Sequence, residues 1–258
     1  ARSGEYIVLG AHYDHLGLGG AGSLDPDSRD IHNGADDNAS GTAALIEVAR
    51  NLAATGGLPR PVLFIAFSGE ERGLLGSSHF VRSPTRDLDD VVAMLNMDMV
   101  GRLRDDRITV FGEATAEEWT ALVEAANSGL PSPLNITLQP DGFGPSDHAS
   151  FYGAGIPVLH FFTGTHTEYH RPVDDVETLD VDGLERVVAL VTATALELTG
   201  QDAAPATLTV VEGVAPESTG GGRGYGPYFG SIPDMGAADV IGVRISGVRE
   251  NSPADRAG

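Results

Sequence analysis

The stretch VLFIAFSGEERG, residues 62–73, decides the fold class and raises the first question about function. Residues 62–67 are all apolar, as in a strand that is buried on both faces. Two adjacent carboxylates, Glu70 and Glu71, follow this run closely. Strands of this kind occur mainly in parallel sheets, where ligands bind outside the carboxyl ends of the strands. The stretch therefore predicts a parallel sheet with acidic groups at its ligand-binding edge.

The rest of the chain, up to about residue 200, alternates strand-like and helix-like segments. Short apolar runs predict further strands at residues 6–9, 91–97, 108–111, 134–138 and 156–162. Apolar residues at helical spacing predict helices at residues 40–52, 73–81, 115–126 and 184–198. Since strands alternate with helices, we expect an α/β fold with a mostly parallel sheet covered on both faces.

The composition excludes several classes of function. The net charge is −21, from 37 acidic and 16 basic residues, and such a surface repels nucleic acids and anionic membranes. No apolar stretch approaches the ~18 residues that a membrane-spanning helix needs. The chain has no cysteine, so disulfides, thiolate ligands and a cysteine nucleophile are excluded. Any bound metal must be held by His, Asp and Glu.

Five short motifs carry acidic or imidazole groups at predicted strand ends or in loops. They are AHYDHLG (11–17), NGADDNASG (33–41), SGEERG (68–73), NMDMVG (96–101) and EYHRPVDD (168–175). Each has an ordinary structural interpretation, such as a helix-capping turn or a solvated surface. Asp98 is different, because a carboxylate within an apolar run needs a cation or a hydrogen-bonding partner. Together the motifs supply the donors that two zinc ions sharing a carboxylate would use.

In this order, the five motifs resemble the co-catalytic di-zinc aminopeptidases of the bacterial leucyl aminopeptidase type, over roughly residues 5–200. The resemblance implies a three-layer α/β/α sandwich with a mixed, mostly parallel central sheet, known as the zinc exopeptidase fold. It also implies two zinc ions and roles for individual residues. These are Asp36 as the bridging ligand, His12 and Asp98 at one ion, Glu71 and His170 at the other, and Glu70 as the general base.

The resemblance implies further details around these ligands. Asp14 would hold the far nitrogen of His12, and Asp174 would do the same for His170. The peptide bond between Asp36 and Asp37 would be cis.

One position departs from the family pattern. Related aminopeptidases often have a tyrosine three residues before SDH, where its hydroxyl stabilises the oxyanion, and this chain has Phe143 there. Phenylalanine cannot donate a hydrogen bond, so either zinc alone does this work or another donor replaces the tyrosine. His160, His166 and Tyr169 are candidates, and the alternative is that these three side chains only pack or cap. Asp147 and His148 are expected to shape the pocket, and His15, His32 and His79 to be structural or on the surface.

The resulting hypothesis is a zinc-dependent aminopeptidase that hydrolyses the first peptide bond of a peptide substrate. A related carboxypeptidase and a single-zinc glutaminyl cyclase are the enzymatic alternatives, and a non-catalytic peptide-binding scaffold is the alternative from another class. By resemblance, a secreted or periplasmic location is expected. The oligomeric state stays open.

The composition changes after residue 200. Residues 201–226 are rich in Gly, Pro, Ala, Ser and Thr and are expected to form a linker, with one short strand at 208–211. Residues 227–258 resemble the start of a PDZ domain, through YFGSI (228–232) and GVRISGV (242–248). The expected organisation is thus a catalytic domain at 1–200, a linker, and an incomplete PDZ-like segment.

Overall fold

The chain divides into two units, Ala1–Thr209 and Val210–Gly258, and all five motifs lie in the first. The structure, a computed structural model, describes residues 4–20, 22–25, 27–200, 231–233, 245–248 and 253–257. The predicted linker and the strand predicted at 208–211 lie outside the described residues.

A six-stranded mixed sheet forms the centre of the first unit. Its strands are β1 (Tyr6–His12), β2 (Val62–Phe67), β3 (Val91–Met97), β4 (Arg107–Phe111), β5 (Asn135–Gln139) and β6 (Val158–Phe162). The order across the sheet is β2-β1-β3-β6-β4-β5. The first four strands in this order run parallel, whereas β4 lies antiparallel to β6 and pairs in parallel with β5. This arrangement confirms the prediction of an α/β fold with a mostly parallel sheet.

Strand β1 shows why the apolar runs are continuous. All seven of its residues are buried. Because side chains alternate across a strand, Ile7, Leu9 and Ala11 join the core on one face of the sheet, while Tyr6 and Val8 join the core on the other. A strand covered on both faces has no position for a solvated side chain, so the alternation of apolar and polar residues disappears.

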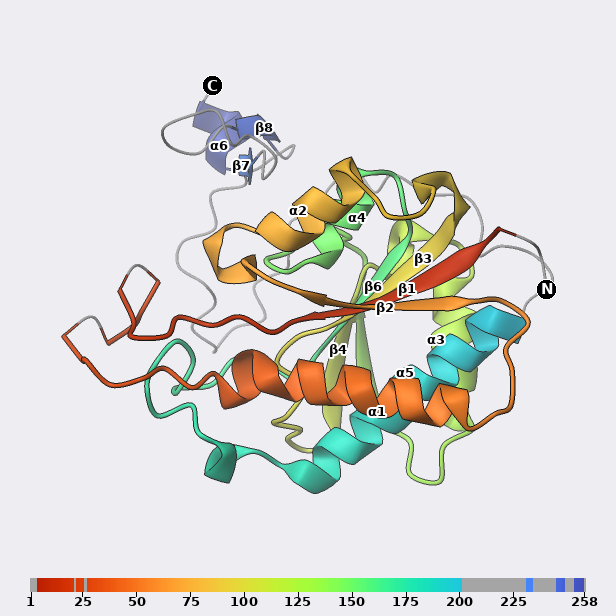
Figure 1. Cartoon of the computed structure of the whole chain (residues 1–258), viewed down its shortest axis with the longest axis horizontal. Coiled ribbons are helices and arrows are strands. Elements are labelled where there is room, and N and C mark those ends of the chain that lie inside the picture. The colour runs from red at the N-terminus through yellow and green to blue at the C-terminus, as the bar shows by residue number, and fades with distance from the viewer. Residues whose placement is uncertain are drawn as a thin grey trace. The chain divides into compact units, whose positions relative to one another are not determined.

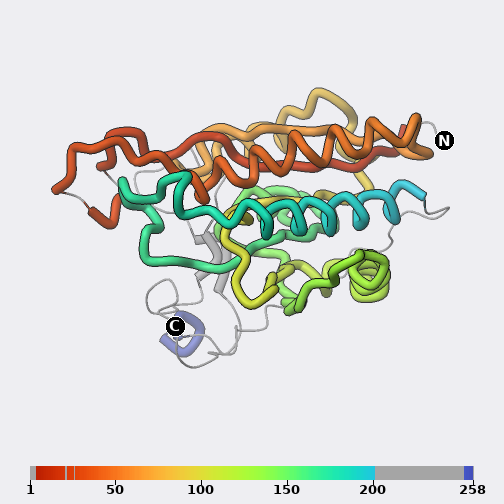
Figure 2. The backbone as a smooth tube through the Cα atoms, turned by 90° about the horizontal axis from the view of Figure 1, so that it is seen from below, coloured from red at the N-terminus to blue at the C-terminus, as the bar shows by residue number. Residues whose placement is uncertain are grey.

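Helices cover both faces of the sheet (Figure 1). On one face lie α1 (Gly41–Ala53), α3 (Trp119–Ser128) and α5 (Val181–Gly200), whose apolar residues share one core. On the other lie α2 (Leu75–Arg82) and α4 (His148–Gly153). Figure 2 shows α1 and α5 side by side, in agreement with their contacts. The expected three-layer α/β/α sandwich is therefore present.

The helix predicted at 73–81 begins later than expected. A short turn at Glu70–Arg72 and the left-handed residue Leu74, with φ of 58°, precede α2. This turn separates the two carboxylates from the helix and holds them directly beyond the end of β2.

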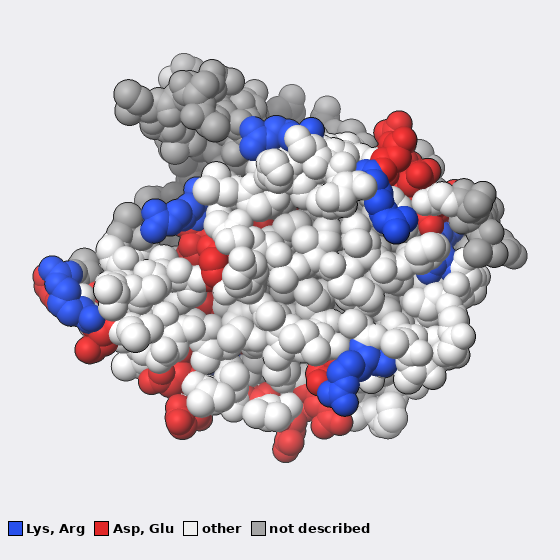
Figure 3. All heavy atoms as spheres, viewed as in Figure 1, with Lys and Arg blue, Asp and Glu red and all other residues white. Residues whose placement is uncertain are grey.

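The described residues of the second unit form two strands and a short helix. β7 (Ser231–Pro233) pairs antiparallel with β8 (Ile245–Val248), and α6 spans Pro253–Ala257. Among the helices in the described part of the chain, none combines the length and the apolar composition that a membrane crossing requires. On the face shown in Figure 3, acidic and basic side chains both lie singly or in small groups, separated by uncharged surface.

Candidate metal centre

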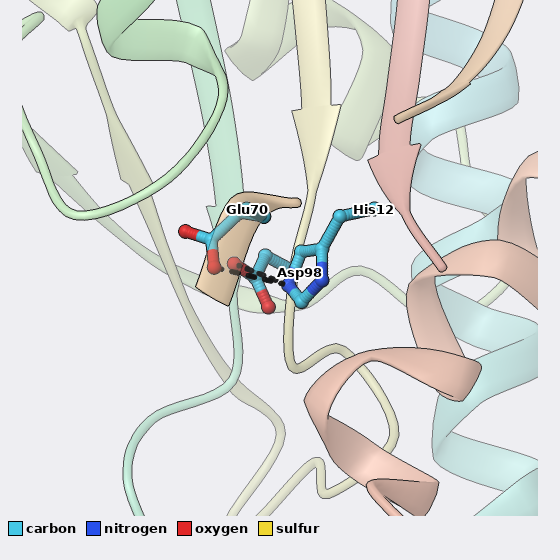
Figure 4. Close-up of side chains that lie close together, drawn as sticks. All are labelled: His12, Glu70 and Asp98. Carbon is cyan, nitrogen blue, oxygen red and sulfur yellow. Dashed lines mark ion pairs between the residues drawn. The ribbon is translucent and has the colours of Figure 1, made fainter. Parts of the chain in front are cut away.

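The carboxyl ends of three parallel strands bring a first group of side chains together. His12 is the last residue of β1, Asp98 follows β3 directly, and Glu70 lies in the turn after β2. The Nε2 atom of His12 lies 3.4 Å from Oδ2 of Asp98 and 3.9 Å from Oε2 of Glu70. Figure 4 shows the three side chains pointing toward one another from these elements.

A second group is joined to the first by Asp37. His170 Nε2 lies 3.2 Å from Oδ2 of Asp37 and 3.2 Å from Oε2 of Glu71. The other carboxylate oxygen of Asp37, Oδ1, lies 3.4 Å from Nε2 of His12. The two oxygens of one carboxylate thus face the two imidazoles, which is the geometry of a bridging ligand.

The donor spacing fits two tetrahedral zinc ions. Nitrogen and oxygen ligands about 2.0–2.2 Å from a tetrahedral zinc lie about 3.3–3.6 Å apart. The separations of His12 from Asp37 and Asp98, both 3.4 Å, and of His170 from Asp37 and Glu71, both 3.2 Å, are close to this value. Buried Nε2 of His12 and Oδ1 of Asp98 also have no hydrogen-bond partner among the described residues. The residues His12, Asp37, Glu71, Asp98 and His170 are called the candidate metal centre below.

The prediction that Asp36 bridges the two groups is wrong, because the next residue, Asp37, has the bridging position. Oδ1 of Asp36 accepts a hydrogen bond of 2.7 Å from the backbone N–H of Gly101, and its Oδ2 lies 3.2 Å from Nε2 of His166. The cis peptide bond is likewise Asp37–Asn38 and not Asp36–Asp37. Adjacent side chains in an irregular turn point in different directions, so only one of the two carboxylates can face the imidazoles.

Asp14 supports both His12 and Glu70. Nδ1 of His12 donates to the backbone carbonyl of Asp14 at 3.1 Å, and the Asp14 carboxylate lies 3.7 Å from the same nitrogen. This hydrogen bond places the proton on Nδ1 and leaves Nε2 as the ligand atom. Oδ1 of Asp14 accepts the backbone N–H of Glu70 at 3.1 Å. The predicted support of His12 is present, but the closer contact is to the carbonyl.

The prediction that Asp174 holds the far nitrogen of His170 is wrong. That nitrogen, Nδ1, donates to the backbone carbonyl of Gly22 at 2.8 Å. Asp174 instead accepts the backbone N–H groups of Asp36 and Asp37 through Oδ2. The carboxylate is fully buried and lies behind the turn that carries the bridging side chain.

His15 contacts the candidate metal centre, although the sequence indicated a structural or surface residue. Its Nδ1 lies 2.6 Å from Oε1 of Glu71, and its ring packs edge-on against His170. A separation of 2.6 Å is too short for two ligands of one ion and fits a hydrogen bond that His15 donates to the carboxylate. Its place three residues after His12, in the same strand-end loop, was the available signal. His32, which bonds Ser23, and exposed His79 are structural and surface residues as expected.

Ser146 and Asn96 form a chain behind Asp98 that the sequence did not indicate. Ser146 Oγ donates to Oδ2 of Asp98 at 2.7 Å, and Asn96 Nδ2 lies 2.8 Å from Ser146 Oγ. The same amide lies 3.1 Å from Nδ1 of His160, whose ring stacks on His148 at 4.3 Å. His160 is therefore part of the support behind Asp98.

Phe143 and the two remaining oxyanion candidates, His166 and Tyr169, lie in different environments. Phe143 packs edge-on against Tyr152, with ring centroids 4.6 Å apart. His166 faces the carboxylates of Asp36 and Glu168. Tyr169 stacks on the ring of His170 at 3.8 Å, so of the three donor candidates it is the one in ring contact with the candidate metal centre.

The pKa shifts show how strongly negative the centre is. Burial and the nearby charge of Asp98 raise the pKa of Glu70 to about 10. Burial opposes ionisation of Glu71 as well, but hydrogen bonds from His15 and His170 lower its pKa to about 2. Burial lowers the pKa of His12, yet Asp98 and Asp37 more than reverse this and raise it. Bound cations would supply this missing positive charge and displace the protons.

The fold and the centre together define a class: an α/β protein with a candidate metal site beyond the carboxyl ends of three parallel strands. The sequence model of Peptidase family M28 matches residues 1–195, and the chain belongs to this family. It is 32% identical over 211 residues to aminopeptidase YwaD of Bacillus subtilis (strain 168), covering 79% of this chain and 43% of YwaD.

Solved structures agree with this assignment. BSAP, a zinc aminopeptidase from Bacillus subtilis, matches with a TM-score of 0.63 and 28% identity, over 77% of this chain and 47% of BSAP. Porphyromonas gingivalis glutaminyl cyclase has a TM-score of 0.62 at 20% identity, over 75% of this chain and 73% of the cyclase, which shows a shared fold alone. The chain spans about half the length of the curated relatives it matches.

Proposed function

We propose that this protein is a zinc-dependent aminopeptidase that binds two zinc ions and hydrolyses the amino-terminal peptide bond of peptides. The observation that carries the proposal is the bridging position of Asp37 between His12 and His170. Membership of Peptidase family M28 and the similarity to YwaD and BSAP support it. His12, Asp37 and Asp98 would hold one ion, and His170, Asp37 and Glu71 the other.

We propose Glu70 as the general base, and its distance from the proposed ligand atoms supports this role. Its Oε2 lies 3.9 Å from Nε2 of His12, farther than the 3.2–3.4 Å that separate the proposed ligand atoms. When bound, the zinc ions would polarise the scissile carbonyl and make the attacking water more acidic. Glu70 takes the proton from that water and delivers it to the leaving amine. The hydrogen bond from its backbone N–H to Asp14 holds the residue in place for both transfers.

Tyr169 is the best candidate for the missing oxyanion donor. It stacks on His170, whereas His160 contacts Asn96 and His166 faces the carboxylate of Asp36. Hydrolysis that falls about 10²–10³-fold in Tyr169→Phe, with zinc retained, is the result expected of an oxyanion donor.

The proposal is tested with aminoacyl chromogenic substrates, their N-acetylated counterparts, and a chelator arm with zinc added back. Hydrolysis of the free-amine substrates only, lost on chelation and restored by zinc, is expected. Glu70→Gln should keep its zinc and lose about 10²–10⁴-fold in kcat. The control, Glu47→Gln, changes an exposed glutamate on α1 that pairs with Arg50 and should leave kcat unchanged. Full activity of Glu70→Gln would refute the assignment of the base.

The alternatives give different results in the same experiment. A glutaminyl cyclase of the single-zinc type would hold one zinc per chain and cyclise amino-terminal glutamine. A carboxypeptidase would leave both sets of chromogenic substrates intact, because they lack a free carboxyl-terminal carboxylate, and would instead release the last residue of an N-acetylated peptide. A scaffold would bind peptides without hydrolysis and regardless of chelator.

For residues 227–258, the antiparallel β7–β8 pair and α6 are compatible with the proposed start of a PDZ domain.

A further inference from the structure

A buried charged cluster lies behind the turn that carries Asp37. It consists of Arg102, Asp36, Asp174, His166 and Glu168, and is called the Arg102 cluster here. The carboxylates of Asp36 and Asp174 are completely buried, and the side chain of Arg102 is 11% exposed. Burying charges costs several kcal/mol per ion unless they are paired and hydrogen-bonded. Such a buried set of charges next to the candidate metal centre therefore suggests a role in that centre.

The cluster holds the backbone of the turn from behind. Oδ2 of Asp174 accepts the N–H groups of Asp36 at 3.0 Å and of Asp37 at 3.1 Å. Its backbone carbonyl accepts the N–H of Ala35 at 3.0 Å. Three consecutive N–H groups of the turn thus bond one residue. The Asp37 backbone is fixed by this residue, and its side chain is left free to face His12 and His170.

Arg102 connects this turn to the loop that carries His170. Its Nη2 donates to Oδ1 of Asp174 at 2.8 Å and to Thr178, and its Nη1 donates to Oε2 of Glu168 at 2.8 Å. Glu168 precedes His170 by two residues and Asp174 follows it by four. One guanidinium therefore spans both ends of the His170 loop. Charge-assisted hydrogen bonds of this kind are roughly twice as strong as neutral ones.

A second buried arginine shows what purely structural pairing looks like. Arg60 donates from Nη1 to the backbone carbonyl of Leu198 and lies 3.2 Å from the carboxylate of Glu5. Glu5 precedes β1, at the opposite end of the strand from His12. Arg60 is thus buried and paired like Arg102, but far from the candidate metal centre.

We propose that Arg102 and Asp174 are positioning residues of the metal centre, which set Asp37 and His170 at the separation that a shared ion requires. The inference rests on the proposed function, because it assumes that Asp37 and His170 bind the same zinc. Neither positioning residue is itself a proposed zinc ligand. Asp174 acts through the backbone of the turn, and Arg102 acts through Asp174 and Glu168.

The test measures zinc affinity of the full chain by competition with a chromogenic chelator, and the visible spectrum after cobalt substitution. Asp174→Asn keeps the size of the side chain but places an amide against Arg102, and Arg102→Gln removes the link to Glu168. Each should weaken zinc binding about 10–100-fold and alter the cobalt spectrum. The control Arg60→Gln should lower the melting temperature while leaving affinity and spectrum unchanged.

The outcomes separate this inference from the proposed function. Folded Asp174→Asn and Arg102→Gln with zinc affinity within twofold of the wild type, and an unchanged cobalt spectrum, would overturn the positioning role. If Asp174→Asn does not fold, Arg102→Gln decides alone. If Arg60→Gln weakens zinc binding as much as the other two, the effect is general destabilisation and the inference fails. A wild-type chain that binds no zinc would overturn the metal centre itself, and this inference with it.

Discussion

Replacing Asp37 by asparagine should weaken both zinc sites strongly, and replacing Asp36 in the same way should weaken them far less. Asp37 offers one oxygen toward His12 and the other toward His170, so a single change affects two ions. Asp36 bonds Gly101 and faces His166, away from both imidazoles. The two residues are neighbours of identical chemistry, and each variant is therefore the matched control of the other.

The size of the effect follows from the number of ligands. Zinc binding in a four-ligand site is worth about 10–16 kcal/mol, or about 2.5–4 kcal/mol per ligand if shared equally. Losing one ligand then costs about 10²–10³-fold in affinity. Asparagine keeps one weakly coordinating oxygen, which favours the lower end, about 10²-fold at each ion. Asp36→Asn keeps an acceptor for the Gly101 N–H, so we expect a loss of at most about tenfold.

The assay is a zinc titration against a chromogenic chelator, combined with metal analysis after gel filtration and a melting curve for each variant. After gel filtration, Asp37→Asn should contain less than one zinc per chain, and Asp36→Asn should contain as much as the wild type. If Asp36→Asn loses as much zinc as Asp37→Asn while both stay folded, the bridging geometry is wrong. One tightly retained zinc in Asp37→Asn would argue against a shared carboxylate.

Two further perturbations address neighbouring histidines. His15→Phe keeps the ring against His170 but removes the hydrogen bond to Glu71, so it should weaken zinc binding at the site that contains His170 by about 10–100-fold. The control His32→Phe should leave zinc binding unchanged. Equal zinc titration curves for the two variants would contradict this role of His15. His148→Phe should flatten the loss of stability in acid. Burial lowers the pKa of His148 well below its usual value and lowers that of His160 to about 4. Below about pH 6.5 these two histidines therefore bind protons in the unfolded chain but stay neutral in the folded chain, so the free energy of unfolding falls as the pH drops. Between pH 6.5 and 5, urea unfolding should show about 2 kcal/mol less loss in the variant, and parallel curves would exclude a neutral buried His148.

The sheet and most helices were predictable because their signal is local. A strand covered on both faces needs a continuous apolar run, and Val91–Met97, apolar except for Asn96, is wholly buried. Val62–Phe67 is as apolar, but the expectation that it is buried on both faces is wrong, because β2 lies at the edge of the sheet and only Phe67 is buried. The side chains that follow these strands were predictable for the same reason. Once β1, β2 and β3 are parallel neighbours, His12, Glu70 and Asp98 must emerge at one edge.

The errors in the candidate metal centre all concern loops, where no periodicity fixes the direction of a side chain. Asp36 and Asp37 have the same chemistry, and their roles are decided by which of them has its carboxylate turned toward His12. Asp174 was placed near His170 correctly in the chain but incorrectly in space, because the loop folds back onto the turn at Asp37. His15 was missed because a lone histidine in a loop is ordinarily a structural residue.

The strand order explains why the centre lies where it does. The chain moves from β1 through α1 to β2 on one side, and then through α2 to β3 on the other side of β1. Helices α1 and α2 accordingly lie on opposite faces of the sheet. Where the direction of winding reverses, the loops after adjacent strands diverge and leave a crevice at their carboxyl ends. His12 ends the strand at this reversal, so the same topology that separates the two helical layers also brings His12 to face Asp37 and Asp98.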